Sequence, residues 1–304
     1  MSSKNSSLKQ FRIEIEAKVQ KAFEPFVDFN KLKKTKRKPK AVKTSLLYLR
    51  KNLSANKHDS GIENLGTDWM LKEIGRGMIR YSRRIAWLMR HYTWAARVPV
   101  LADKTRARVV DIGCDVAEIR KIMSASFYYP NPLYLGVDIN HETLNAALPE
   151  MASRTPGLLV QHDVTFGLKF IKSGTVDCIF CGEIIEHFSE EYGLVMLKEM
   201  KRILKPGGVF FISTPCKKNS KGYKFHVYEY EPEELKKIIK GLGFHIIRSY
   251  GWVTTERVLK KRMSEKDRVF YEKALKRCHK DVLVPIMAHL NPNYGDAFCI
   301  EARK

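Results

Sequence analysis

An apolar segment that ends in Asp-x-Gly constrains the fold of this chain more than any other feature. The segment is Arg108-Val-Val-Asp-Ile-Gly-Cys114, and about one strand–helix unit later a second apolar segment, 133–138, ends in Asp138. Gly113 would let the backbone approach a ligand closely, and an acid at the end of the second strand can accept hydrogen bonds from both ribose hydroxyls. The spacing therefore predicts an α/β fold that binds an adenosine-containing cofactor. NAD-binding folds share this logic, so the pattern alone leaves the cofactor open.

Strand-like and helix-like segments alternate from residue 106 to the end. Short apolar runs typical of strands fall near 108–112, 133–138, 158–161, 176–181, 208–214, 244–250 and 296–302, and helical patterns fall near 116–125, 141–150, 190–204 and 232–242. Such alternation predicts an α/β fold with a mostly parallel sheet and helices on both faces. Between the last two strands we expect a long, basic and mostly helical insert at about 253–290.

Further segments make the pattern more specific. Val176-Asp-Cys-Ile-Phe-Cys181 leads into Gly182-Glu-Ile-Ile-Glu-His187, and a helix ending at Leu204-Lys-Pro-Gly-Gly208 leads into Val209-Phe-Phe-Ile-Ser-Thr-Pro215. With the first motif, these segments resemble the class I S-adenosylmethionine-dependent methyltransferases from about residue 106 to 304. The resemblance implies an enzyme with a seven-stranded Rossmann-like sheet, a reversed last strand near 296–302, and S-adenosyl-L-methionine as cofactor.

The resemblance also assigns the cofactor contacts. The expected residues are Asp111, Gly113, Cys114, Asp138, Ile139, Asp163, Val164, Cys181 and Gly182. Asp138 would bind the ribose, Asp163 would lie near the adenine amino group, and the backbone at Cys181 and Gly182 would lie near the methionine end. Structural roles compete with the two acidic assignments, because Asp138 could cap the next helix and Asp163 could be a turn residue.

The glycine motif departs from the family pattern Asp-x-Gly-x-Gly-x-Gly. Asp115 and Ala117 stand where the second and third glycines would be. Aspartate tolerates left-handed backbone geometry better than most residues, so we expect cofactor binding to be retained. A catalytically inactive, nucleic-acid-binding relative of the fold remains an alternative.

Two glutamates and two histidines form the candidate catalytic set: Glu183, Glu186 and His187 after the fourth strand, and His226 after the fifth. We expect all four at the carboxyl edge of the sheet, where chemistry occurs in open α/β folds. The layout resembles ubiquinone-biosynthesis-type O-methyltransferases and also the Hua-enhancer type of small-RNA 2′-O-methyltransferase, in which such a quartet binds a divalent metal. The second resemblance implies Mg²⁺ or Mn²⁺ at these four residues, which would lower the pKa of the attacking hydroxyl. Without metal, His187 or His226 could act as a general base, and a purely structural role is the third interpretation.

Positive charge is concentrated in the N-terminal third. The chain has a net charge of +22, and residues 1–108 hold 26 Lys and Arg against 9 Asp and Glu. Such asymmetry favours a polyanionic partner, nucleic acid first and an anionic membrane second, while the alternative is a solubilising tail. We expect residues 1–66 to be a basic, partly disordered or helical arm, and residues 67–105 to be an amphipathic helical extension of a methyltransferase domain at 106–304. The basic run at 31–40 is compatible with a binding arm, a nuclear-import signal or a charged linker.

A long amphipathic helix is expected from Asp68 to about Trp94. Its apolar stripe comprises Ile74, Met78, Tyr81, Ile85, Leu88 and Tyr92, and Arg76, Arg80, Arg83, Arg84 and Arg90 lie largely off it. Arginines interleaved with aromatic rings suit a nucleic-acid face, because guanidinium groups bind phosphate while rings stack on bases. The equally weighted alternative is a helix that packs its aromatic side chains onto the catalytic domain. Nucleic acid is thus expected to contact residues 31–97 and the 253–290 insert.

Several classes are disfavoured. No apolar run is long enough to span a bilayer, and the start of the chain lacks a signal-peptide core. Cys178 and Cys181 have C-x-x-C spacing but fall in an expected strand, where their side chains point to opposite faces, so reduced thiols in a cytoplasmic or nuclear location are expected. The sequence therefore predicts a methyltransferase acting on nucleic acid, RNA rather than DNA, with ribose O-methylation as one form. The alternative is a small-molecule, glycan or lipid O- or N-methyltransferase, and the oligomeric state is left open.

Overall fold

Two compact units make up the chain in the computed structural model. The structure describes residues 17, 19–34, 48–49, 81–98, 106–125, 132–151, 157–218 and 223–304. The first unit comprises residues 1–65, 98–179 and 199–208, and the second comprises residues 66–97, 180–198 and 209–304. Strands β5 (Val176–Gly182) and β6 (Leu204–Pro215) contribute residues to both units.

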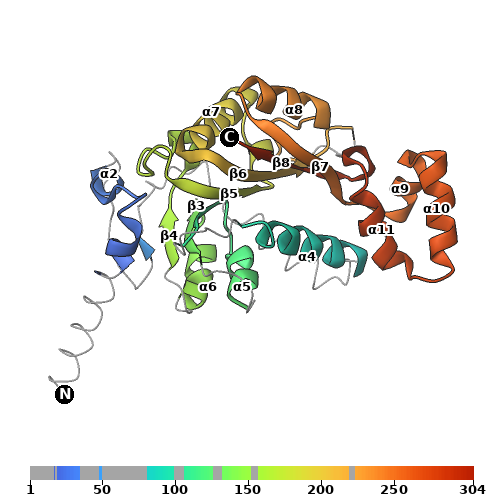
Figure 1. Ribbon diagram of the computed structural model, residues 1–304, viewed down its shortest axis with the longest axis horizontal. Helices are drawn as coiled ribbons and strands as arrows, with labels where there is room; N and C mark the ends of the chain where they lie inside the picture. The colour runs from blue at the N-terminus through green and yellow to red at the C-terminus, as the bar shows by residue number, and fades with distance from the viewer. Residues whose placement is uncertain are drawn as a thin grey trace, which may run out of the picture. The chain divides into compact units, whose positions relative to one another are not determined.

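The strands of the first unit carry the expected cofactor motif. They are β1 (Tyr48–Leu49), β2 (Arg108–Ile112), β3 (Leu133–Asp138), β4 (Gly157–Gln161) and the beginning of β5, hydrogen-bonded in the order β1-β4-β3-β2-β5. Pairs β1–β4, β3–β4 and β2–β3 are parallel. Helices α5 (Glu118–Ala125) and α6 (His141–Met151) follow β2 and β3 and lie on the same side of these strands (Figure 1). These boundaries confirm the expected strand–helix alternation, since parallel strands need such crossovers.

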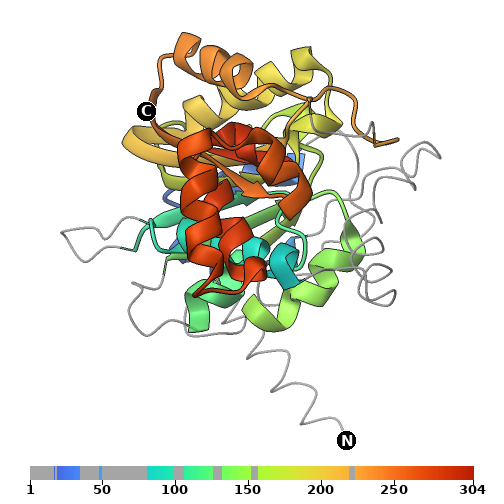
Figure 2. The same cartoon turned by 90° about the vertical axis from the view of Figure 1, so that its right-hand side faces the viewer.

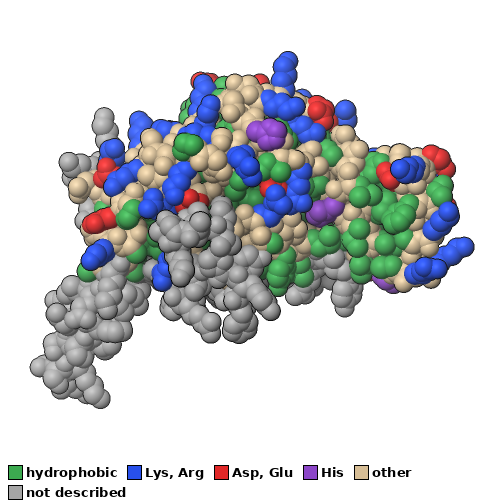
Figure 3. Space-filling model, in the orientation of Figure 1, with side chains coloured by type: hydrophobic (Ala, Val, Ile, Leu, Met, Phe, Trp, Pro, Cys, Tyr) green, Lys and Arg blue, Asp and Glu red, His purple; other side chains and the backbone are tan. Residues whose placement is uncertain are grey.

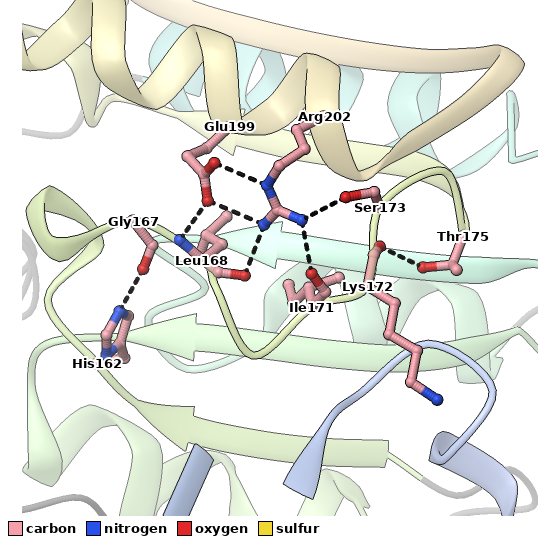
Figure 4. Close-up of polar contacts among 9 residues, drawn as sticks. All are labelled: His162, Gly167, Leu168, Ile171, Lys172, Ser173, Thr175, Glu199 and Arg202. Carbon is pink, nitrogen blue, oxygen red and sulfur yellow. Dashed lines mark hydrogen bonds and ion pairs between the residues drawn. The ribbon is translucent and has the colours of Figure 1, made fainter. Parts of the chain in front are cut away.

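An arginine fixes the loop between β4 and β5. Arg202, in the last turn of helix α7 (Glu190–Ile203), donates to the carbonyl oxygens of Leu168 (2.9 Å) and Ile171 (2.9 Å) and pairs with Glu199 (2.7 Å), as Figure 4 shows. Glu199 in turn accepts the backbone N–H of Leu168 at 2.8 Å. Because these bonds satisfy buried backbone groups on both sides of the loop, they rigidify the segment that follows Asp163.

Residues 19–34 pack against the same loop. Phe23, Phe26 and Val27 are buried. The backbone N–H of residue 28 donates to the carbonyl of residue 170 at 2.6 Å, and that of residue 172 donates to the carbonyl of residue 26 at 2.8 Å. This part of the basic N-terminal segment is therefore a packed element of the first unit, and α2 (Phe29–Lys34) closes it. The polybasic run beyond residue 34 lies outside the described residues.

The strands of the second unit correct one expectation. They are the end of β5, β6, β7 (His245–Val253) and β8 (Ala297–Arg303), in the order β5-β6-β8-β7. Strand β8 pairs antiparallel with both β6 and β7, and the short β1 adds an eighth strand. The sheet is therefore mixed, and the expectation of a mostly parallel sheet was wrong. The expected reversed last strand near 296–302 is confirmed by β8, but its place between β6 and β7 was not predicted from the sequence.

Helices flank these strands on two sides. Helix α7 and helix α8 (Pro232–Gly241) lie on one side of β6, β8 and β7, and helix α4 (Tyr81–Ala95) lies on the other (Figure 1). Trp94 in α4 is only 1% exposed and stacks on Phe180 with ring centroids 5.8 Å apart. Its indole N–H donates to the Tyr250 hydroxyl at 2.9 Å. In its described part, the predicted 68–94 helix thus packs Trp94 into the second unit, whereas Tyr92 is 55% exposed. Trp69 and the expected N-terminal half of that helix lie outside the described residues.

The expected insert forms a small helical layer of its own. It comprises α9 (Glu256–Arg262), α10 (Glu265–Leu275) and α11 (Lys280–Ala288), with α10 and α11 side by side (Figure 2). Their shared core contains Leu259, Met263, Tyr271, Leu283, Val284, Met287 and Tyr294. Helix α11 also packs on α4. Within the described residues, no helix is long and apolar enough to cross a membrane.

Candidate functional site

The turn after β2 has the backbone geometry of a ligand-binding loop. Gly113 has φ 69°, and its N–H donates to the carbonyl of Val137 at 2.8 Å. Asp115 and Ala117, which stand in place of glycines, also have positive φ values of 46° and 57°. A left-handed conformation at a residue with a Cβ costs about 1 kcal/mol or more, so the loop keeps the glycine-type path despite both replacements.

Asp138 lies at the end of β3 with its carboxylate held from two sides. Its Oδ2 accepts the backbone N–H of Asp115 at 2.9 Å, and its Oδ1 accepts that of Asn140 at 2.8 Å. Burial raises the pKa of Asp138 to about 6 despite these two bonds. Asn140 caps the following helix by accepting the N–H of residue 142 at 2.8 Å. Asn140, and not Asp138, therefore caps this helix.

The remaining predicted residues of the first unit have local partners. Asp111 accepts a hydrogen bond from the Tyr134 hydroxyl at 2.6 Å, which ties the end of β2 to β3. Asp163 caps the short helix η1 (Val164–Phe166) by accepting the Thr165 N–H at 3.0 Å and its hydroxyl at 2.6 Å. Asp163 thus has the turn role that the sequence left open. Cys114 and Val164 are buried, and Ile139 lies between Asp138 and the capping Asn140.

In the second unit, β5 ends at two of the predicted cofactor residues. Cys181 is fully buried, and Gly182 lies so close to Trp94 that an added Cβ would stand 3.3 Å from the indole ring. A side chain at this position would require Trp94 to shift by a few tenths of an ångström. Glu183 follows directly, in a left-handed conformation with φ 56°.

Three of the four predicted catalytic side chains converge. Glu186, His187 and His226 each offer a donor atom, and these atoms lie within 4.8 Å of one another. We call these residues the Glu186–His187–His226 cluster. Glu186 lies in η2 (Ile185–His187), is 1% exposed, and accepts a hydrogen bond from the Thr214 hydroxyl at 3.0 Å. Its backbone carbonyl accepts the N–H of residue 227 at 2.7 Å and that of residue 228 at 3.1 Å, so the two loops are tied together.

Hydrogen bonds set the state of both imidazoles. His187 Nδ1 lies 3.0 Å from the carbonyl of Phe225. A carbonyl only accepts, so Nδ1 carries the proton and Nε2 keeps its lone pair. Burial lowers the pKa of His187, which favours this neutral form. His226 Nδ1 lies 2.5 Å from Glu229 Oε1, a contact that orients the ring.

Glu229 is a partner of His226 that the sequence analysis did not anticipate. The available signal was its spacing: His226 and Glu229 are three residues apart, close enough to pair within one loop turn. Many His-x-x-Glu pairs occur on solvated surfaces, so the spacing alone could not distinguish this one.

The fourth predicted side chain, Glu183, is held elsewhere. Its Oε1 accepts the Ser213 hydroxyl at 2.6 Å and pairs with Arg90 at 3.3 Å. Arg90, from α4, is 6% exposed, and its guanidinium carbon lies 4.2 Å from the Trp252 ring centroid. Burial, together with the charge of Glu183, raises the pKa of Glu186 well above its ordinary value. An empty cluster therefore favours a protonated Glu186, whereas binding a cation would favour its ionised form.

Comparison with known proteins identifies relatives of this arrangement. The family model described as "Methyltransferase domain" matches residues 86–249. The ubiquinone biosynthesis O-methyltransferase of Burkholderia ambifaria is 27% identical over 188 residues, which cover 55% of this chain and 73% of that protein. The enzyme of the same description from Cupriavidus pinatubonensis is 25% identical over 178 residues, covering 52% of this chain and 67% of that protein.

Solved structures share the fold at lower sequence identity. A SAM-dependent methyltransferase from Archaeoglobus fulgidus is 18% identical, with a TM-score of 0.52, and the match covers 78% of this chain and 100% of that one. Magnesium protoporphyrin IX methyltransferase from Synechocystis, solved with bound SAH, is 13% identical with a TM-score of 0.53, covering 81% and 99%. These similarities establish a common architecture.

Proposed function

The chain belongs to the methyltransferase domain family, and we propose that, as an S-adenosylmethionine-dependent methyltransferase, it methylates an oxygen atom of its acceptor at the Glu186–His187–His226 cluster. The observation that carries this proposal is the convergence of one carboxylate and two imidazoles, with donor atoms within 4.8 Å of one another. This set begins four residues after Gly182, at the end of β5. Groups of this kind remove a proton from a hydroxyl, or hold a cation that lowers the pKa of that hydroxyl.

Residues of the first unit fit the cofactor. The left-handed turn at Gly113, Asp115 and Ala117 gives close backbone approach, and the partly satisfied Asp138 carboxylate can accept two ribose hydroxyls. We assign Asp111 the role of ordering that turn. We place the adenine near Asp163, whose carboxylate keeps lone pairs that its capping bonds do not use. S-adenosylmethionine supplies an electrophilic methyl group on a sulfonium.

The chain's own residues supply the base. The acceptor hydroxyl would lose its proton to the free Nε2 of His187 or to that of His226. Glu229 holds the His226 ring through Nδ1 and leaves Nε2 to face an acceptor, so we assign His226 as the proton acceptor. Glu186 is held by Thr214 and shapes the cluster.

A divalent metal is the second form of the same proposal. Two imidazoles and one carboxylate make a three-ligand site that leaves positions for two acceptor oxygens. Glu186, His187 and His226 would be the ligands, and Glu183, predicted as a fourth, would join only if Arg90 released it. Mg²⁺ or Mn²⁺ there would lower the pKa of the acceptor hydroxyl.

The acceptor that we favour is a small molecule with neighbouring oxygen atoms. Relatives named for ubiquinone biosynthesis support this class.

Helix α4 does not strengthen the nucleic-acid alternative, because Arg90 and Trp94 are buried in the second unit. The specific observation that keeps RNA as the second candidate is the net charge of +22, concentrated before residue 109. We retain residues 1–66 as a binding arm, residues 67–105 as an extension, and 106–304 as the catalytic domain within this proposal. The buried thiols support a reducing, cytoplasmic or nuclear location.

One assay separates the acceptors. Purified protein is incubated with methyl-labelled cofactor and three acceptors: a catechol, RNA with a free 2′,3′-diol at its end, and the same RNA after periodate oxidation of that diol. We expect label on the catechol; label on intact RNA alone would move the assignment to terminal ribose methylation. The variant His226→Ala should lose transfer to any acceptor, whereas the exposed His279→Ala serves as the matched control. Equal transfer by both variants would overturn the cluster's role.

A further inference from the structure

A hollow of about 560 Å³ opens on the second unit between α8 and the start of β7. It is lined by Glu233, Lys236, Lys240, Phe244, His245, Ile246, Arg248 and Ser249. None of these residues belongs to the Glu186–His187–His226 cluster or to the predicted cofactor residues. Lys and Arg side chains gather over α8 on the face drawn in Figure 3.

The lining is strongly basic. Lys236 and Lys240 lie one turn apart on α8, and His245 and Arg248 come from β7. The acid in the lining, Glu233, is mostly exposed and pairs with Lys236 at 2.7 Å. Lys240 and His245 are exposed, so their polar atoms are open to a ligand. One carboxylate among three cationic side chains and an imidazole leaves an excess of hydrogen-bond donors.

Arg248 is held in place before any ligand arrives. Its Nε lies 2.5 Å from Glu301, a carboxylate 1% exposed that Arg97 also pairs with at 2.5 Å. The Arg248 side chain is 39% exposed, and the two arginines more than balance the charge of the one buried acid. A register shift between Ile246 and Arg248 marks a bulge in β7, and bulges of this kind re-aim a side chain.

We propose that this hollow binds a phosphate group, at a site separate from methyl transfer. The planar Arg248 guanidinium, with two nitrogens besides the one on Glu301, suits paired hydrogen bonds to phosphate oxygens. Lys240, His245 and the Ser249 hydroxyl surround the same space, and Phe244 and Ile246 give it an apolar wall. The phosphate would come from an RNA backbone or from a phosphorylated small molecule. The site does not depend on which acceptor is methylated.

Calorimetry with inorganic pyrophosphate tests the site directly. Lys240→Glu and Lys198→Glu change the net charge equally, and both residues are exposed, but Lys198 lies on α7 away from the lining. We expect Lys240→Glu to weaken pyrophosphate binding at least about tenfold and Lys198→Glu to leave it within about twofold, because only a local contact discriminates between them. The cofactor affinity of both variants should equal that of the unmodified chain, which separates this test from the proposed function.

A second arm identifies the source of the phosphate. If RNA occupies the hollow, Lys240→Glu should also weaken RNA binding and RNA should displace pyrophosphate. If a small phosphorylated molecule occupies it, RNA affinity should be insensitive to Lys240→Glu. Absence of pyrophosphate binding, or an equal loss in the Lys240→Glu and Lys198→Glu variants, would overturn the proposal.

Discussion

Replacing Trp94 with alanine tests whether α4 belongs to the core of the second unit. The indole is 1% exposed, stacks on Phe180, and lies 5.8 Å from the Phe211 ring centroid. Truncating a buried Trp to Ala typically costs about 3–5 kcal/mol through lost transfer free energy and the cavity left behind. The change also removes the hydrogen bond to the Tyr250 hydroxyl, which is worth about 1 kcal/mol. We therefore expect the free energy of unfolding to fall by about 4 kcal/mol.

The matched control lies on the same helix. Tyr92 is 55% exposed, so Tyr92→Ala should change the free energy of unfolding by less than about 0.5 kcal/mol. Urea unfolding followed by circular dichroism would compare both variants with the unmodified chain. A Trp94→Ala variant of normal stability would refute the packing argument. If that variant were stable yet bound RNA weakly, α4 would instead be a nucleic-acid face.

Three other predictions concern the site. Cofactor affinity should fall as the pH drops through about 6, because the ribose needs an ionised Asp138. The raised pKa also means that the folded chain binds this proton more tightly than the unfolded chain, so the contribution of Asp138 to stability should decrease from about pH 4 to pH 6. Asp138→Asn should remove both trends, the first measured by calorimetry and the second by thermal melting. Glu229→Gln should lower the rate of methyl transfer by about tenfold to a hundredfold with unchanged cofactor affinity, since the partner of His226 is neutralised; an unchanged rate would remove Glu229 from the site. If a metal acts at the cluster, a chelator should abolish transfer and Mn²⁺ should restore it, whereas full activity in chelator would leave the histidine base alone.

The strand ends that carry the expected cofactor residues could be predicted because they are specified locally. Asp111, Gly113 and Asp138 stand at strand ends, and a strand followed by a glycine turn is specified within a few residues. The positive φ at Asp115 and Ala117 was foreseen only for aspartate. The alanine side chain has no polar group that could stabilise a positive φ, so the hydrogen bonds of the rest of the loop must hold Ala117 in this conformation.

The catalytic half could be predicted only in part because its contacts are distant in sequence. Glu186 and His187 meet His226 as their positions after two strands indicated. Arg90 lies 93 residues before the glutamate that it holds, and no sequence pattern within α4 distinguishes it from the other arginines of the helix. The reversed direction of the last strand was predicted, but its position between β6 and β7 was not, because that pairing depends on the whole sheet.

The central claim is that the Glu186–His187–His226 cluster carries out methyl transfer while residues of the first unit bind the cofactor. A single-turnover measurement on His226→Ala tests it most directly, with SAH affinity determined on the same preparation. The account predicts unchanged SAH affinity and a transfer rate lower by about a hundredfold or more, since a general base contributes on that scale. A normal transfer rate in His226→Ala with normal SAH affinity would contradict it.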